Sequence, residues 1–125
     1  MKLLSSLTLV LLLTGCANLT FDSTEFDGYV TLQETVDGIN CESSDVPQQI
    51  QILKKQIDHQ FRYSNYRNDS RPLIASSAVE IKTMIDSLSS RYDITQRPPS
   101  VEYCKQKTKN ISAGIQVLLK ELGRL

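Results

Sequence analysis

Apolar residues recur at spacings of three and four in four segments of the chain, and this period constrains the fold more than any other feature. Such spacing places side chains on one face of an α-helix, whereas a strand needs alternation, which nowhere extends beyond five residues. The four stripes are Tyr29, Leu32, Val36 and Ile39; Val46, Ile50, Leu53, Ile57 and Phe61; Ile74, Ala78, Ile81, Ile85 and Leu88; and Cys104, Thr108, Ile111, Ile115, Leu118 and Leu122. The pattern predicts an all-α fold, a small four-helix bundle that forms one domain.

Capping residues and prolines indicate where these helices begin and end. Asp45 and Ser100 are suitable N-caps, because their side-chain oxygens can accept hydrogen bonds from free backbone N–H groups. Pro47 and Pro72 stand in first turns, where a missing N–H costs nothing. Gly123 suits the position just past the end of the last helix.

Two segments without the helical period are expected to be loops. Residues 62–69 are rich in turn-forming side chains, and residues 93–99 contain two consecutive prolines, which cannot extend a helix. The first helix, expected over residues 25–40, contains two glycines that weaken it. A short strand at residues 29–32 is therefore the alternative for that segment.

The N-terminus has the organisation of a cleaved export signal. Lys2 supplies a positive charge, and Leu3–Leu13 forms an apolar stretch of eleven residues. As a helix this stretch spans roughly half of a bilayer core, which is too short for a permanent anchor but typical of a signal peptide. The sequence Leu13-Thr14-Gly15-Cys16 that follows resembles a bacterial lipobox, in which the cysteine thiol receives a diacylglyceryl group.

The lipobox divides the chain into three expected parts: a signal peptide at 1–15, a polar tether at 16–24 that starts with acylated Cys16, and the helical bundle at 25–125. Two or three acyl chains make membrane attachment effectively permanent, whereas one chain holds only marginally. In lipoproteins to which this N-terminus is similar, Asp after the acylated cysteine favours the inner membrane, so Ala17 implies the outer membrane. The alternative is an ordinary signal peptide followed by an incidental cysteine.

Cys41 and Cys104 remain as free thiols once Cys16 carries lipid. An exported chain enters an oxidising compartment, so we expect these two residues to form a disulfide. Helices joined by short loops alternate in direction, which brings the helix start after Cys41 to the same end of the bundle as the helix start that contains Cys104. Two separate buried thiols are the alternative. A zinc site is not expected, because the single histidine, His59, lacks close spacing to either cysteine.

The segment around Cys41 carries a family resemblance. Cys41 is followed by four residues and then by Val46 and Pro47, ahead of an amphipathic helix. A polar loop with a tyrosine follows at residues 64–66, and the second cysteine of the pair stands in the run 101–105 that opens the last helix. This arrangement resembles the type II secretion pilotins of the PulS/OutS class.

The resemblance covers residues 28–122, although Phe61-Arg62-Tyr63 stands where family members often carry a tryptophan. It implies a small helical lipoprotein with one disulfide, held by its lipid at the periplasmic face of the outer membrane. Pilotins of this class bind the C-terminal tail of a secretin subunit and carry it to the outer membrane, where the secretin ring assembles. The implied partners are this tail and the membrane.

A secretin tail that folds as an amphipathic helix would lie in a groove between two helices of the bundle. A domain of this size cannot bury all of its aliphatic residues, so some of them are available to line such a groove. The residues expected there belong to the first and last helices: Tyr29, Leu32, Val36, Leu118, Leu119 and Leu122. Closed core is the alternative for each of them, because the period does not distinguish a groove wall from a core.

Composition and motifs argue against several other functions. Fourteen basic residues balance fourteen acidic ones, so the chain lacks the concentrated basic face of nucleic-acid-binding proteins. It has no glycine-rich phosphate loop, nucleophile elbow or recognisable acid–base pair. We therefore expect no catalytic residue, metal or cofactor, and a surface position for His59. The alternative function is that of a phage- or plasmid-encoded exclusion or immunity lipoprotein, or of another envelope lipoprotein that binds a protein partner.

Overall fold

A computed structural model describes residues 21–65, 67–93 and 97–125. The expected signal peptide, the acylation site Cys16 and residues 17–20 of the expected tether lie outside the described residues. The described residues contain no strand; they form one 3₁₀ turn and four helices. These elements are α2 (Ser23–Asp37), α3 (Val46–Asn65), the 3₁₀ turn η2 (Asn68–Ser70), α4 (Pro72–Asp93) and α5 (Val101–Gly123).

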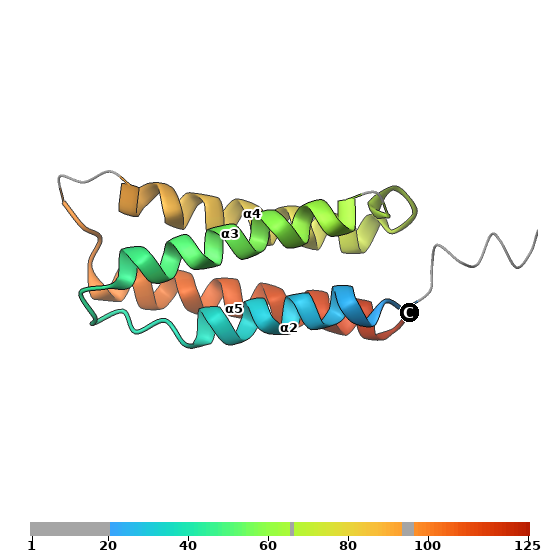
Figure 1. Cartoon of the computed structure of the whole chain (residues 1–125), viewed down its shortest axis with the longest axis horizontal. Coiled ribbons are helices and arrows are strands. Elements are labelled where there is room, and N and C mark those ends of the chain that lie inside the picture. Colours follow the sequence, from blue (N-terminus) through green and yellow to red (C-terminus); the bar gives the residue numbers. More distant parts are fainter. Residues whose placement is uncertain (1–20, 66, 94–96) are drawn as a thin grey trace, which may run out of the picture.

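The four helices run alternately up and down and form an elongated bundle (Figure 1). Each helix packs on the next one along the chain, and α5 closes the ring by packing on α2. The predicted all-α four-helix bundle with one disulfide is thus confirmed. We call the end of the bundle at which the described chain begins and the C-terminus lies the terminal end (Figure 1). The opposite end, with the connection from α2 to α3 and the start of α5, holds the bond between Cys41 and Cys104, and we call it the disulfide end.

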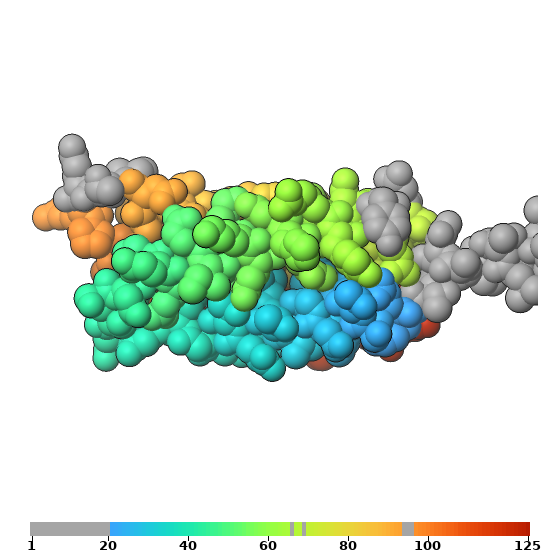
Figure 2. Space-filling model, in the orientation of Figure 1, coloured from blue at the N-terminus to red at the C-terminus, as the bar shows by residue number. Residues whose placement is uncertain are grey.

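The predicted apolar stripes form the core of the bundle. Every member of the four stripes is buried except Ile39, Phe61 and Thr108, which are partly exposed. Figure 2 views the molecule from the side of α2 and α3, whose side chains meet along the length of the bundle. Burial of one face of each helix is therefore the main stabilising interaction, as expected for short helices whose intrinsic stability in water is small.

Several predicted helix boundaries agree with the structure. Ser100 caps α5, since its hydroxyl accepts a hydrogen bond of 3.1 Å from the N–H of Tyr103. Pro72 is the first residue of α4, and Asp45 directly precedes α3, with its carboxylate accepting a 2.7 Å bond from the Gln49 side chain. The alternative of a strand at residues 29–32 is wrong, because these residues lie within α2.

Other boundaries differ from the expected ones. α2 begins at Ser23 because the Asp22 carboxylate accepts hydrogen bonds from the next free N–H groups, so two residues of the expected tether are helical. α2 ends at Asp37 rather than at residue 40. α3 continues through residues 62–65, which we expected in a loop, because Gln60 and Ser64 extend its buried face. Gly123 lies inside α5 and has no left-handed conformation.

A ring of four alternating charges joins α3 to α4 on the surface of the bundle. Lys54 lies 3.0 Å from Asp58 and 2.8 Å from Asp86, and Lys82 lies 3.2 Å from Asp58 and 2.7 Å from Asp86. Two of the four pairs connect residues on different helices. The ring therefore links α3 to α4 at one position along the bundle and adds a pair at i and i+4 within each helix.

Candidate functional site

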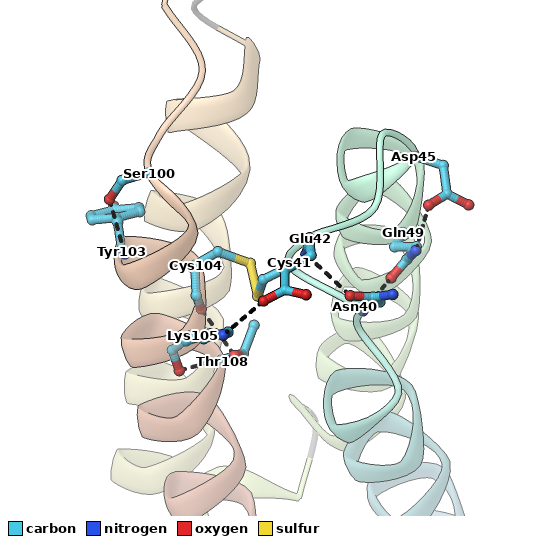
Figure 3. Close-up of a disulfide and its surroundings, with 10 residues drawn as sticks. All are labelled: Asn40, Cys41, Glu42, Asp45, Gln49, Ser100, Tyr103, Cys104, Lys105 and Thr108. Atoms are coloured by element: carbon cyan, nitrogen blue, oxygen red, sulfur yellow. Dashed lines mark hydrogen bonds and ion pairs between the residues drawn. A yellow bond between two sulfur atoms is a disulfide. The ribbon is translucent and has the colours of Figure 1, made fainter.

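The predicted disulfide between Cys41 and Cys104 is present, with a Cα–Cα distance of 5.7 Å. Cys41 lies in the connection between α2 and α3, whereas Cys104 is in the first turn of α5 and fully buried (Figure 3). The bond therefore attaches the first interhelical connection to the last helix. It holds together the two helices, α2 and α5, whose contact closes the ring of the bundle.

Most of the residues predicted to line a binding groove are instead part of the core. Leu119 is partly buried against the core, and the other five are at most 2% exposed: Tyr29, Leu32, Val36, Leu118 and Leu122. The inner faces of α2 and α5 point to the bundle axis, where α3 and α4 cover them. This closed packing corrects the expected position of the groove, and of the six residues only Val36 also borders an open depression.

An open groove does lie between α2 and α5, on the outer side of their seam in the half of the bundle nearer the disulfide. We call it the α2–α5 groove. Its volume is about 640 Å³, which falls in the range of roughly 300–1,000 Å³ typical of binding pockets. Its apolar lining comes from Val36, Ile39 and Cys41 on one side and from Ala113 on the other.

Side chains of opposite charge stand on the two sides of the α2–α5 groove. Asp37 and Glu42 belong to the side of α2 and its following connection, and Lys105 and Lys109 belong to α5. The Lys105 ammonium lies 3.2 Å from the Glu42 carboxylate across the seam (Figure 3). Because these two side chains are 59% and 69% exposed, their pair is weak and can open for a ligand at little cost.

A second polar feature, buried at the terminal end, was not predicted from the sequence. Arg71 donates two hydrogen bonds to the Glu25 carboxylate, at 2.6 and 2.9 Å, and both side chains are 1% exposed. Arg71 also donates to Asn68, and Gln60 donates a 2.9 Å bond to the carbonyl of Glu25. The cluster ties α2, α3 and the start of α4 together, and its partners are protein groups rather than an open site.

The glycine at position 28 is explained by this buried cluster. A Cβ atom at Gly28 would stand 2.0 Å from the Gln60 side-chain oxygen, so only glycine admits the buried amide as it is placed. In the sequence the same glycine only weakened the predicted helix. The signal that could have revealed the cluster is Glu25, which lies four residues before Tyr29 and thus continues the apolar stripe with a carboxylate.

Tyr29 occupies the core next to this cluster, and burial raises the pKa of its hydroxyl to about 12. The hydroxyl therefore remains protonated at neutral pH. A buried phenol with a raised pKa is a poor acid and a poor nucleophile under these conditions. Tyr29 is consequently a structural residue of the core.

The remaining candidates are His59 and any cluster of metal-binding side chains. His59 is exposed on the surface of α3. Within residues 21–65, 67–93 and 97–125 there is no cluster of three or more His, Cys, Asp or Glu side chains placed to hold a metal ion. No helix among these residues has the length and apolar character needed to cross a membrane.

The α2–α5 groove is thus a candidate ligand site, since it combines apolar residues with charged side chains on both sides. Comparison with known proteins found no matching family model, no matching curated protein and no matching solved structure.

Proposed function

We propose that this chain is an outer-membrane lipoprotein of the pilotin type, which binds the C-terminal tail of a type II secretion secretin and promotes its targeting and assembly. The lipobox that ends at Cys16 and the resemblance around Cys41 support the proposal. The helical bundle with its Cys41–Cys104 disulfide is consistent with the pilotin proposal. The observation that carries the binding function is the α2–α5 groove, an open depression in which a few apolar residues lie between charged and polar side chains of α2, its following connection and α5.

In this mechanism the disordered tail folds as an amphipathic helix along the seam of α2 and α5. Its apolar side chains would pack against Val36, Ile39 and Ala113, and its polar side chains would face the charges on either side. Ordering the tail costs several kcal/mol, so the affinity would depend on a few apolar contacts. The groove accommodates a row of side chains rather than a whole helix, which would leave most of the tail on the surface.

The proposed activity divides among three parts of the chain. The acyl chains on Cys16 hold the protein in the membrane, the disulfide keeps the seam of α2 and α5 together, and the groove holds the secretin tail. Each step is a binding or tethering step, so none requires a catalytic residue, metal or cofactor.

Binding can be tested by titrating the protein with synthetic C-terminal peptides of secretins and following the affinity by calorimetry. Ser112→Trp fills the α2–α5 groove from α5, and we expect it to weaken binding by about tenfold or more, equal to about 1.4 kcal/mol. Val117→Trp is the matched control, because Val117 is 55% exposed on the same helix but lies outside this groove. Equal affinities for both variants, with both folded by circular dichroism, would contradict binding in this groove.

The tethering part has a separate test in cells. Cys16→Ser removes the acylation site, and we expect the variant to fold and bind the tail while secretin multimers fail to reach the outer membrane. Membrane fractionation with detection of the secretin would measure this. Normal delivery of secretin multimers by the variant would refute the tethering model.

A further inference from the structure

The two ends of the bundle differ in the apolar surface that they expose. At the terminal end Leu73 is 70% exposed, Phe21 is 42% exposed and Leu125 is 39% exposed. At the disulfide end no described large hydrophobic side chain is exposed. The other exposed large hydrophobics of the described residues lie along the sides of the helices: Ile52, Val79 and Val117. Among the residues that the structure describes, the terminal end therefore concentrates such side chains.

Two of these residues surround a hollow at the tip of the bundle. Leu73 and Leu125, with Pro72 and Ile74, line a depression of about 250 Å³ between the start of α4 and the end of α5. Figure 1 places the start of the described chain and the C-terminus at this end. The apolar tip is therefore adjacent to the point from which the N-terminal segment departs.

Two arginines at the terminal end have carboxylate partners within the protein. Arg124 lies 2.7 Å from Glu121, and the buried Arg71 pairs with Glu25. These two arginines therefore need no anionic lipid as a partner. Exposed aliphatic and aromatic groups beside compensated charges are suited to the interface of a lipid bilayer.

The position of Cys16 limits how far this tip can be from a membrane. Cys16 precedes Asp22 by six residues, and a chain of that length reaches at most about 22 Å. Asp22 is fixed to the bundle, because its carboxylate accepts a 2.9 Å bond from the Tyr63 hydroxyl and lies 3.0 Å from Arg67. A lipid on Cys16 would therefore hold the apolar tip close to the headgroups at a high local concentration.

We propose that the terminal end of the bundle lies on the bilayer, with Leu73, Leu125 and Phe21 inserted into the lipid interface. The inference rests on the proposed acylation of Cys16 and adds a second contact that sets the orientation of the bundle. α5 has 23 residues, a length of about 35 Å. The bundle thus stands away from the membrane, and the α2–α5 groove, in the half nearer the disulfide, faces the periplasm.

Tryptophan fluorescence tests this contact, since the natural chain contains no tryptophan. The acylated protein with Leu73→Trp is reconstituted into phosphatidylcholine vesicles with and without brominated phosphatidylcholine. We expect a shift of the emission to shorter wavelength and quenching by about half, because interfacial side chains are buried roughly 5–10 Å among the lipids. Leu125→Trp is a second probe, because Leu125 follows the end of α5 and is not part of the core. Ile52→Trp is the matched control, because Ile52 is 54% exposed on the side of α3, and we expect no quenching there.

The outcomes separate this contact from the proposed function. If mass spectrometry finds Cys16 acylated and neither terminal probe is quenched, the contact is refuted while tail binding and tethering stand. Quenching that requires added phosphatidylglycerol would refute apolar insertion in favour of attraction by charge. An unmodified Cys16 would overturn the lipoprotein proposal and the contact together, whereas failure of the secretin peptide to bind would leave the contact intact.

Discussion

At the scale of single residues, the bond between Glu25 and Arg71 is the most consequential polar interaction. Both side chains are 1% exposed, and the two N–H···O bonds of 2.6 and 2.9 Å form the parallel pair that guanidinium and carboxylate groups favour. Removing water from two charges is costly, and the pair compensates that cost only while both partners are present. Loss of either partner therefore leaves an uncompensated buried charge.

We expect Glu25→Gln to lower the free energy of unfolding by about 3 kcal/mol, because the nearly isosteric amide leaves the Arg71 charge buried without its carboxylate. Urea unfolding followed by circular dichroism measures the change. Glu121→Gln is the control for removing a carboxylate at the surface, since its partner Arg124 is 71% exposed, and its effect should stay below about 0.5 kcal/mol. Similar losses in both variants would contradict a special role for the buried pair.

At the scale of elements, the charge ring of Lys54, Asp58, Lys82 and Asp86 connects α3 and α4. Partial burial acts to raise the pKa of Asp58 and Asp86, but hydrogen bonds and charge from the two lysines outweigh it and lower both pKa values below 3.8. A carboxyl group with a lower pKa in the folded state stabilises the fold above its unfolded pKa. This stabilisation is lost as the pH falls through the folded pKa.

The ring should therefore contribute to the acid sensitivity of the bundle. We expect the double variant Asp58→Asn/Asp86→Asn to lose less free energy of unfolding than the natural chain between about pH 6 and about pH 3. The difference should be no more than about 1 kcal/mol, because the aspartates are 37% and 39% exposed and solvent screens them. Urea unfolding across this pH range measures the difference in the free energy of unfolding. An identical pH dependence in both proteins would show that the ring does not contribute to stability.

At the scale of the whole molecule, the disulfide and the closed ring of helices act together. The contact of α2 with α5 joins the first and last helices of the bundle, so it requires closure of a long loop of chain. Cys41 and Cys104 are 63 residues apart. A covalent link between them lowers the conformational entropy of the unfolded chain, so that less entropy is lost when the loop closes on folding. The bond also lies beside the α2–α5 groove and so connects stability to the proposed binding surface.

For a separation of 63 residues, loop entropy predicts that Cys41→Ser/Cys104→Ser lowers the free energy of unfolding by roughly 4 kcal/mol. That is a large part of the roughly 5–10 kcal/mol of a small domain. Urea unfolding measures it, and chemical reduction of the natural disulfide should produce the same loss without a change of side chains. A loss below about 1 kcal/mol would mean that the packing of α2 on α5 alone fixes the ring.

The helices and the order in which they connect could be predicted from the amino-acid sequence. Among regular secondary structures, only the α-helix places apolar residues spaced by three and four on one face. The four helices and most of the core could therefore be predicted from Ile50, Ile81, Ile115 and their neighbours. Pro72 was correctly predicted in the first turn of α4, and Ser100 was correctly predicted as the N-cap of α5. The alternating direction of the helices correctly brought Cys41 to Cys104, because short loops leave little freedom of topology.

Which apolar residues form the core, and where an open surface remains, depended on how the helices pack against one another. A helical stripe gives the direction of a side chain but not what covers it, so Tyr29 and Leu118 were expected in a groove and are fully buried. The groove instead lies on the outer side of the same seam, where the connection through Cys41 meets α5. The Glu25–Arg71 pair also could not be predicted without the fold, because residues 46 positions apart meet only when the helices pack around one axis.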